Sequence, residues 1–313
     1  MEKSVSDPAV FEGSTPVQAN GRLYVKGTKL VNEKGDPVCL KGVSTHGIGR
    51  YPQYVDPDSF RTLRDQWHAS LIRLAMYTEE FDGYCITGKQ EELKALIDRG
   101  VQYATDLGMY VIIDWHILSD GHPAKNQKEA EAFFEEMSAK YKDHNNVIYE
   151  ICNEPNSGPD WPAVKKYAED IIPIIRKNDP EAVILVGTPT WSQDVDIAAE
   201  DPVRGYANIM YVLHFYAGTH KEALRDKARA ALQKGLPLFV SEFGISDASG
   251  DGELDKAEGN NWIRFLKEND ISFVCWNLSN KAESSALLNS ASTVTGNFTD
   301  EDLSEQGMWY RNI

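Results

Sequence analysis

The sequence has no long apolar run. No stretch of its 313 residues approaches the roughly 20 apolar residues of a membrane-spanning helix. Residues 1–20 also lack the charged start and apolar run of a signal peptide. We therefore expect no membrane partner, and either an intracellular chain or one whose export signal has been removed.

Basic residues are scarce. Lysine and arginine number 32 against 48 aspartates and glutamates, which gives a net charge of −16. A phosphate backbone is bound by clustered basic side chains, so this composition argues against nucleic acid as a partner. The excess acid indicates a solvated surface and a substrate that is neutral or basic.

Cysteines are few and are not spaced for a zinc site. The four residues Cys39, Cys85, Cys152 and Cys275 form no CxxC pair, and three of them sit in apolar, strand-like runs. We expect free, buried thiols, and we expect neither a cofactor nor a metal.

Linkers and repeats are also missing. No Ser/Gly-rich segment, long charge block or internal repeat divides the chain. The prediction is a polar leader at 1–20 and a single catalytic domain at 21–313. This length suits a (β/α)8 barrel, which typically takes about 250 residues plus insertions.

What is present is an alternation of short apolar runs with longer segments of helical period. Residues 22–39 read as a small hairpin turning at 32–36, placed to cap the bottom of a barrel. Segments 89–107, 127–141 and 161–177 are charged on one side and apolar on the other, as covering helices are. Continuous apolar runs, typical of strands buried on both faces, occur at 38–44, 70–77, 110–115, 147–151, 183–187, 209–215, 237–243 and 273–278. The pattern predicts an α/β protein, a single (β/α)8 TIM barrel.

Polar and aromatic residues gather at the carboxyl ends of these strands, where reaction sites of such barrels lie. They are His46, Arg73, Tyr77, Asp114, His116, Asn153, Glu154, His214, Tyr216, Glu242, Trp276 and Asn277. A single histidine at such a place is more often structural, but the whole set indicates a functional cluster.

Two of these residues, Glu154 and Glu242, lie at the ends of strands four and seven and should face each other across the mouth. Glycoside hydrolysis requires such a pair, one carboxylic acid and one carboxylate; the alternative is a pair of structural carboxylates in ion pairs. Arg73 would favour the charged form of one carboxylate. Tyr216 could hydrogen-bond that anion, Asn153 could reach a sugar 2-hydroxyl, and Trp276 offers an apolar face to a pyranose ring.

The segment IYEICNEP at 148–155 resembles the Asn-Glu-Pro acid/base motif of glycoside hydrolase family 5. It is accompanied in order by LKGVSTHG (40–47), IRLAMY (72–77), IDWH (113–116), LHFYAGTH (213–220), VSEFG (240–244) and CWNLSNK (275–281). The likeness extends from about residue 21 to the C-terminus and is to the bacterial secreted endoglucanases of that family.

This resemblance implies an endo-β-1,4-glucanase that cleaves cellulose and related β-glucans by double displacement. It makes Glu154 the proton donor and Glu242 the nucleophile. The inner shell would be Arg73, His116, Asn153, His214, Tyr216 and Trp276. Positions matching glucose subsites are His46, Tyr77, Trp191, Ala248, Lys281 and Glu283. Secretion follows from the same resemblance, with an export signal upstream of Met1 as a hypothesis. We also expect a monomer.

The sequence departs from the family at two places. Gly49 and Arg50 replace the usual Gln-Trp platform, and Phe243 stands where tryptophan follows the nucleophile. Losing an aromatic platform removes about 1 kcal/mol of stacking, which affects the choice among β-glucans.

Three other hypotheses stay open at this stage. One is a β-mannanase or mixed-linkage β-glucanase on the same barrel. Another is a metal-dependent hydrolase using His46, His116 and His214, because histidine is the commonest zinc ligand. The third is a carbohydrate-binding relative without catalysis. For the retaining glucanase, the two carboxyl groups should lie about 5 Å apart, whereas a gap near 8 Å would indicate inversion.

Overall fold

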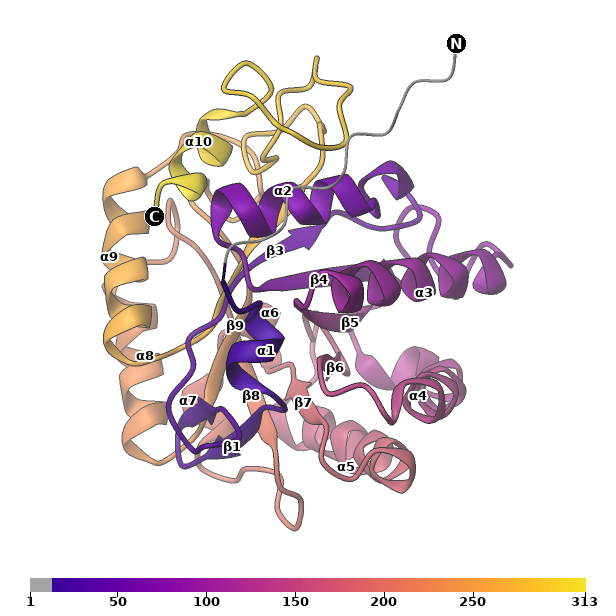
Figure 1. Ribbon diagram of the computed structural model, residues 1–313. Helices are drawn as coiled ribbons and strands as arrows, with labels where there is room; N and C mark the ends of the chain where they lie inside the picture. The colour runs from indigo at the N-terminus through magenta and orange to yellow at the C-terminus, as the bar shows by residue number, and fades with distance from the viewer. Residues whose placement is uncertain (1–12) are drawn as a thin grey trace.

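The fold is a closed barrel of eight parallel strands, seen in a computed structural model that describes residues 13–313 (Figure 1). In barrel order the strands are β3 (Lys41–Thr45), β4 (Leu71–Tyr77), β5 (Tyr110–His116), β6 (Val147–Glu150), β7 (Val183–Val186), β8 (Ile209–Tyr216), β9 (Leu238–Gly244) and β10 (Phe273–Leu278). Strand β10 pairs with β3 and closes the ring. All eight predicted strands are present, and the predicted TIM barrel is confirmed.

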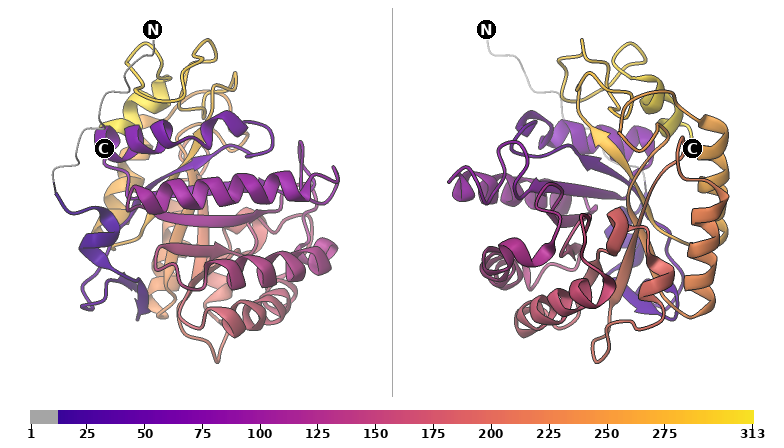
Figure 2. Two further views of the ribbon diagram at one scale, coloured as in Figure 1. Left: turned by 45° about the vertical axis from the view of Figure 1, so that its right-hand side comes forward. Right: turned by 180° about the vertical axis from the view of Figure 1, so that it is seen from behind.

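Helices surround the barrel on its outside (Figure 2). The longer ones in the described part are α2 (Pro57–Trp67), α3 (Gln90–Asp106), α4 (Gln127–Tyr141), α5 (Trp161–Asn178), α8 (Glu222–Gln233) and α9 (Lys256–Glu268). Shorter ones are η1 (Pro52–Tyr54), η2 (Pro123–Asn126), α6 (Pro189–Ser192), α7 (Val195–Ala198) and α10 (Glu305–Arg311). The three predicted helical segments correspond to α3, α4 and α5. In the described part, no helix combines the length and apolar character needed to cross a membrane.

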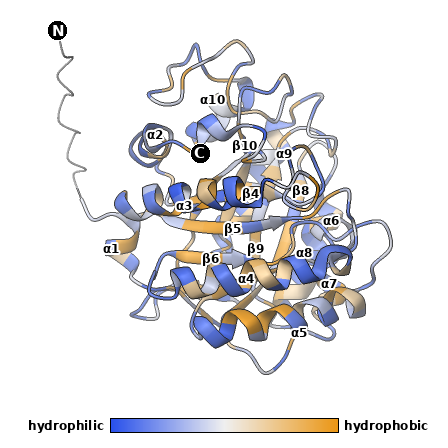
Figure 3. Ribbon diagram, turned by 90° about the vertical axis from the view of Figure 1, so that its right-hand side faces the viewer, coloured by the Kyte–Doolittle hydropathy of each residue, from blue (hydrophilic) through white to orange (hydrophobic). Residues whose placement is uncertain are grey.

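Helix boundaries follow from local sequence. Asp56 precedes Pro57, and its carboxylate accepts the backbone N–H groups of Asp58 and Ser59 at the start of α2. Asp160 caps α5 in the same way through the N–H of Ala163. The covering helices turn apolar residues toward the strands and polar residues outward (Figure 3).

Alternation along the strands divides the core into two clusters. On β5, Val111 and Ile113 pack toward the helices, whereas Tyr110 and Ile112 belong to a separate cluster. That second cluster also holds Leu71, Ile148, Val183, Leu185, Met210, Val212, Phe239 and Val274. Because successive side chains of a strand point to opposite faces, the second cluster fills the barrel interior.

The N-terminal hairpin closes the end of the barrel where the strands begin. Its strands are β1 (Tyr24–Lys26) and β2 (Lys29–Val31), and Leu23 and Leu30 join the interior cluster. Asn208 accepts the N–H of Val25 at 2.9 Å, which ties the hairpin to the loop before β8. The predicted cap at the barrel bottom is therefore confirmed.

The turn of this hairpin was placed wrongly by the sequence pattern. The chain reverses at Gly27, whose φ of +61° suits glycine, between β1 and β2. The predicted turn at 32–36 makes a second reversal, because Asn32 accepts two N–H bonds there and Val31 bridges to Pro37. The chain has two consecutive turns where the sequence pattern predicted one.

The predicted polar leader at 1–20 is only partly described, since residues 1–12 lie outside the described residues. Within its second part, Pro16–Asn20 forms the short helix α1, capped by Thr15 and Gln18. Val17 donates its N–H to the carbonyl of Gly108 at 2.9 Å, so α1 contacts the barrel.

Candidate active site

The site continues the inward-facing positions of the strands above the apolar interior. On β4, Leu71 belongs to the interior cluster, and Arg73 and Tyr77 follow at the same parity. On β5, Asp114 and His116 follow Ile112 in the same way. Toward the carboxyl ends of the strands, the inward-facing side chains therefore change from apolar residues to ionic residues, and the last of them lie at the open mouth of the barrel.

A register shift in β9 places the second glutamate. Val212 of β8 pairs with Phe239, yet His214 pairs with Glu242, so β9 uses one extra residue over this interval. The pairing of β9 with β10 shifts at the same place. Such a bulge re-aims side chains, and here both Ser241 and Glu242 take part in the interior polar network.

Arg73 is the centre of that network and is fully buried. It donates through Nε to Glu150 at 2.8 Å, and through Nη1 to Glu242 at 3.0 Å. Nη2 donates to Asn153 at 2.6 Å and lies 3.0 Å from Asp114. Burial alone would lower the pKa of Arg73, but the carboxylates of Asp114, Glu150 and Glu242 outweigh it and raise that pKa.

Two hydrogen-bond donors contact the carboxyl group of Glu242. Its Oε2 accepts from Arg73, and its Oε1 accepts from the phenolic O–H of Tyr216 at 2.8 Å. Burial first, and then the negative charge of Glu242, raise the pKa of Tyr216 well above its usual range, so the phenol stays a donor. Both contacts stabilise negative charge on the carboxylate.

Glu154 has the opposite surroundings. Burial raises the pKa of Glu154 to about 8, more than Arg73 lowers it, and Asp114 and Glu150 raise it further. Its hydrogen-bonding neighbour is Nδ1 of His214, 2.9 Å from Oε1. These surroundings favour the protonated form of this carboxyl group.

The protonation of His214 follows from its other neighbour. Ser241 donates its hydroxyl to Glu150 at 2.7 Å, so the serine oxygen is free to accept from Nε2–H of His214 at 2.9 Å. Burial lowers the pKa of His214 to about 4, which leaves the ring neutral. Nδ1 then carries a lone pair toward Glu154 and accepts from its carboxyl O–H.

A second series of buried hydrogen bonds lies beside the series that joins Glu154, His214, Ser241 and Glu150. Asn153 donates its amide to Nε2 of His116 at 3.2 Å, so Nδ1–H of His116 donates to Asp114 at 2.6 Å. Burial lowers the pKa of His116 well below its usual range. The ring stacks on Trp276 with centroids 5.2 Å apart, which fixes the plane of that indole.

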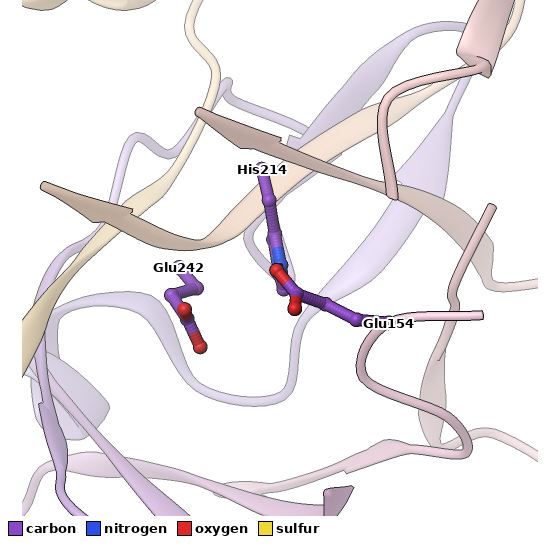
Figure 4. Close-up of side chains that lie close together, drawn as sticks. All are labelled: Glu154, His214 and Glu242. Carbon is purple, nitrogen blue, oxygen red and sulfur yellow. The ribbon is translucent and has the colours of Figure 1, made fainter. Parts of the chain in front are cut away.

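Above these hydrogen bonds opens a cavity of about 570 Å³. Twelve of the fourteen predicted site residues line it: His46, Tyr77, His116, Glu154, Trp191, His214, Tyr216, Glu242, Ala248, Trp276, Lys281 and Glu283. The other two, Arg73 and Asn153, have no exposed surface and lie beneath it. Figure 4 shows Glu154, His214 and Glu242 gathered around one space. One polar atom from each of these three side chains lies within 4.8 Å of the other two.

Several functional positions had no clear signal in the sequence. Leu118, Thr190, Gln193, His220, Ser249 and Gly250 also line the cavity. Glu150 and Ser241 join the buried network, although they lie inside apolar strand runs. Before the structure was known, Glu150 could have been identified only because it lies two residues after Ile148 and so points to the barrel interior, as Ile148 does.

The two departures from the family have different consequences. Phe243 packs away from the cavity, stacked on Phe215 with centroids 5.0 Å apart and close to Tyr310, so it leaves the site unchanged. Arg50 places its guanidinium 5.4 Å from the ring centroid of Phe81, which is 59% exposed. An arginine over a phenylalanine thus stands at the position where the family resemblance implies a Gln-Trp platform.

The three histidines of the metal hypothesis do not form a common centre. His46 accepts the N–H of Gly47 through Nδ1, and both ring nitrogens of His116 and of His214 have protein partners. In the described residues, the group with metal-binding spacing is Glu154, His214 and Glu242. The guanidinium of Arg73, 3.0 Å from Glu242, would repel a cation there. The geometry favours carboxylate chemistry.

A parallel barrel with one protonated and one charge-stabilised carboxyl group in a single cavity has the features of a glycoside hydrolase. The chain belongs to glycosyl hydrolase family 5, because the family model described as "Cellulase (glycosyl hydrolase family 5)" matches residues 31–282. The family resemblance and the glycoside hydrolase class expected from the sequence are both confirmed.

Curated relatives are about 50% identical in sequence to this chain. Endoglucanase A of Butyrivibrio fibrisolvens is 51% identical over 92% of this chain and 67% of its own length. An endoglucanase of Clostridium saccharobutylicum is 50% identical over 93% of this chain and 64% of its own length. The chain thus spans about two thirds of the length of these relatives.

Solved structures agree in fold. The cellulase Cel5C_n is 45% identical, with a TM-score of 0.93 over 97% of this chain and 94% of its own. The catalytic domain of Thermobifida fusca endoglucanase Cel5A, in its E355Q form with cellotetraose, is 37% identical. Its TM-score is 0.90 over 95% of this chain and 98% of its own. Nothing among these relatives favours a mannanase or a metal-dependent hydrolase.

Proposed function

We propose that this chain is a retaining endo-β-1,4-glucanase in which Glu242 is the nucleophile and Glu154 the general acid/base. The observation that carries the proposal is that the two carboxyl groups face one cavity with oxygens within 4.8 Å of each other. Retaining enzymes hold these groups about 5–5.5 Å apart, whereas inverting enzymes leave a wider gap for water.

In the first step the Glu242 carboxylate attacks the anomeric carbon, and the glycosidic C–O bond breaks. Glu154 gives its proton to the departing oxygen, so the sugar alcohol leaves neutral. Arg73 and Tyr216 hold Glu242 in place while its negative charge is consumed in the new bond. The product of this step is a covalent glycosyl-enzyme.

In the second step Glu154 is a carboxylate and accepts a proton from water, which attacks the anomeric carbon and releases Glu242. The lone pair of His214 Nδ1, 2.9 Å from Glu154, disfavours the carboxylate and so strengthens it as a base. Two displacements at one carbon retain its configuration.

The substrate is a β-1,4-glucan such as cellulose. Support comes from the names of the relatives, endoglucanases at 50–51% identity, and from the cellotetraose bound by the Thermobifida relative. Aromatic rings of Tyr77, Trp191 and Trp276 line the cavity and offer apolar faces to pyranose rings. Arg50 in place of the usual platform leaves the preference among β-glucans to be set elsewhere.

The same proposal includes a secreted monomer. A polymer outside the cell is cleaved only by an exported enzyme, and the named relatives are bacterial endoglucanases. We expect activity in the medium of the producing cells and a mass of one chain in sedimentation analysis. Activity confined to the cell interior would contradict the export proposal.

The test is reducing-sugar release from carboxymethyl-cellulose, barley β-glucan, glucomannan, galactomannan and xylan, with Glu242→Gln as the blank. Cleavage of the β-glucans that disappears in the variant is the expected result. Cleavage of mannans alone would move the substrate class and keep the two glutamates. No cleavage of any polymer would favour a binding protein without catalysis.

A further inference from the structure

Glu154 stands on a segment beyond the end of its own strand, where few sheet bonds hold the chain. Strand β6 ends at Glu150, and two sheet-like bonds follow, from the N–H of Ile151 to Leu185 at 3.0 Å and from the N–H of Asn153 to Trp115 of β5 at 3.2 Å. Residues 152–156 have no helix or strand. The position of the acid therefore depends on other bonds to this segment.

Residues 190–192, which make up most of α6, form a turn with an unusual backbone. Thr190, Trp191 and Ser192 have φ values of +58°, +54° and +56°, all left-handed, and none of them is glycine. Each such residue costs about 1–2 kcal/mol relative to a right-handed conformation. The turn persists only because its surroundings hold it.

Two bonds join this turn to the acid segment, one on each side of Glu154. The hydroxyl of Ser192 donates to the carbonyl of Asn153 at 2.6 Å, and the N–H of Trp191 donates to the carbonyl of Pro155 at 3.0 Å. Ser192 has no exposed surface, so water does not compete for its hydroxyl. Both donors of the turn therefore bond the backbone that carries the acid.

We propose that Ser192 is a positioning residue for the general acid, acting through the carbonyl of Asn153 to hold Glu154 at the leaving oxygen. The proposal rests on the assignment of Glu154 under the proposed function. The oxygen of Ser192 also accepts the N–H of Thr188 at 3.3 Å, so one hydroxyl links the start of the turn to the acid segment. Without it, the Asn153 carbonyl loses its partner and the acid carboxyl shifts.

The prediction concerns proton donation alone. A misplacement of about 1 Å costs up to 10²-fold, and the loss applies only where the leaving group needs a proton. In Ser192→Ala we expect kcat/KM for phenyl β-cellobioside to fall roughly 10–100-fold. For 2,4-dinitrophenyl β-cellobioside, whose leaving group departs unprotonated, we expect a fall of less than about twofold.

Two further variants separate positioning from general destabilisation. Ser138→Ala removes a fully buried hydroxyl on α4 that accepts from Asn178 at 3.0 Å, and should leave the ratio of the two rates at its wild-type value. Ser192→Gly suits the left-handed backbone and lacks the hydroxyl, so it should reproduce the Ser192→Ala ratio even where alanine folds poorly.

Equal losses on both substrates, or no loss, in both Ser192 variants would overturn the proposal. Glu154→Gln serves as the reference. If that variant itself shows no dependence on the leaving group, the proposed function fails and not the role of Ser192.

Discussion

The two glutamates of the site are positioned in different ways. Glu242 lies inside strand β9, where a bulge directs it inward and where ladder pairs on both neighbouring strands fix its backbone. Glu154 lies four residues beyond the end of β6, on a segment held by one backbone bond to β5, by side chains and by a left-handed turn. The backbone of Glu242 is fixed by strand pairing on both sides, whereas the position of Glu154 depends mostly on contacts made beyond the end of its strand.

This difference matches the chemistry proposed for each residue. A nucleophile forms a bond to one carbon and profits from a fixed position, with its charge stabilised by Arg73 and Tyr216. An acid/base residue changes protonation twice per turnover, so its surroundings must control its pKa as well as its place. Burial and the neutral ring of His214 supply that control.

The largest effect should come from the residue in the strand. Glu242→Gln removes the nucleophile and keeps the shape, so kcat/KM should fall by about 10⁴-fold or more on every substrate, whatever its leaving group. Initial rates with phenyl and 2,4-dinitrophenyl β-cellobioside measure this. A variant that still cleaves the activated substrate at a substantial rate would contradict the assignment.

Substitution of Glu154, the glutamate beyond the end of its strand, should give a loss of kcat/KM that depends on the leaving group of the substrate. Glu154→Gln should reduce kcat/KM for phenyl β-cellobioside by about 10²–10⁴-fold, the usual contribution of general acid catalysis. The activated substrate should lose far less in the same measurement. Equal losses on both would erase the distinction between the two glutamates.

Arg73 links the two regions, and its removal should cost stability. Arg73→Met leaves Glu150 and Glu242 without their buried partner, for an expected loss of about 3–5 kcal/mol in the free energy of unfolding. Urea titration followed by circular dichroism measures it. Arg229→Met is the control, because that exposed side chain pairs with Glu222 and Asp226 and should contribute less than about 1 kcal/mol.

The smallest expected effect is a change of kcat/KM with pH. A carboxyl group donates a proton only below its pKa, and burial raises that of Glu154 to about 8. The kcat/KM for phenyl β-cellobioside should therefore hold at neutral pH and decline as the pH rises through about 8. Glu154→Gln should lose this alkaline decline. A decline that persists unchanged in that variant belongs to another group.

The sequence predicted the barrel because its strands are buried on both faces and so read as continuous apolar runs. It predicted the residues at the barrel mouth because the carboxyl ends of all eight parallel strands lie at the same end of the barrel. It did not predict the bulge at Ser241 or the left-handed turn at Thr190, because neither contains a glycine to mark it. The role of Ser241 depends on the register shift in β9, which local sequence does not encode, whereas Glu150 was marked only by its parity with the interior residue Ile148.

The distinct placement of the two glutamates is tested most directly by azide rescue with 2,4-dinitrophenyl β-cellobioside. In Glu242→Ala, azide should enter the space left by the nucleophile and give the α-glycosyl azide by a single displacement. In Glu154→Ala, azide should attack the glycosyl-enzyme on Glu242 and give the β-glycosyl azide by double displacement. Proton NMR of the anomeric centre distinguishes the two products, and the reverse assignment, or one product from both variants, would contradict the account.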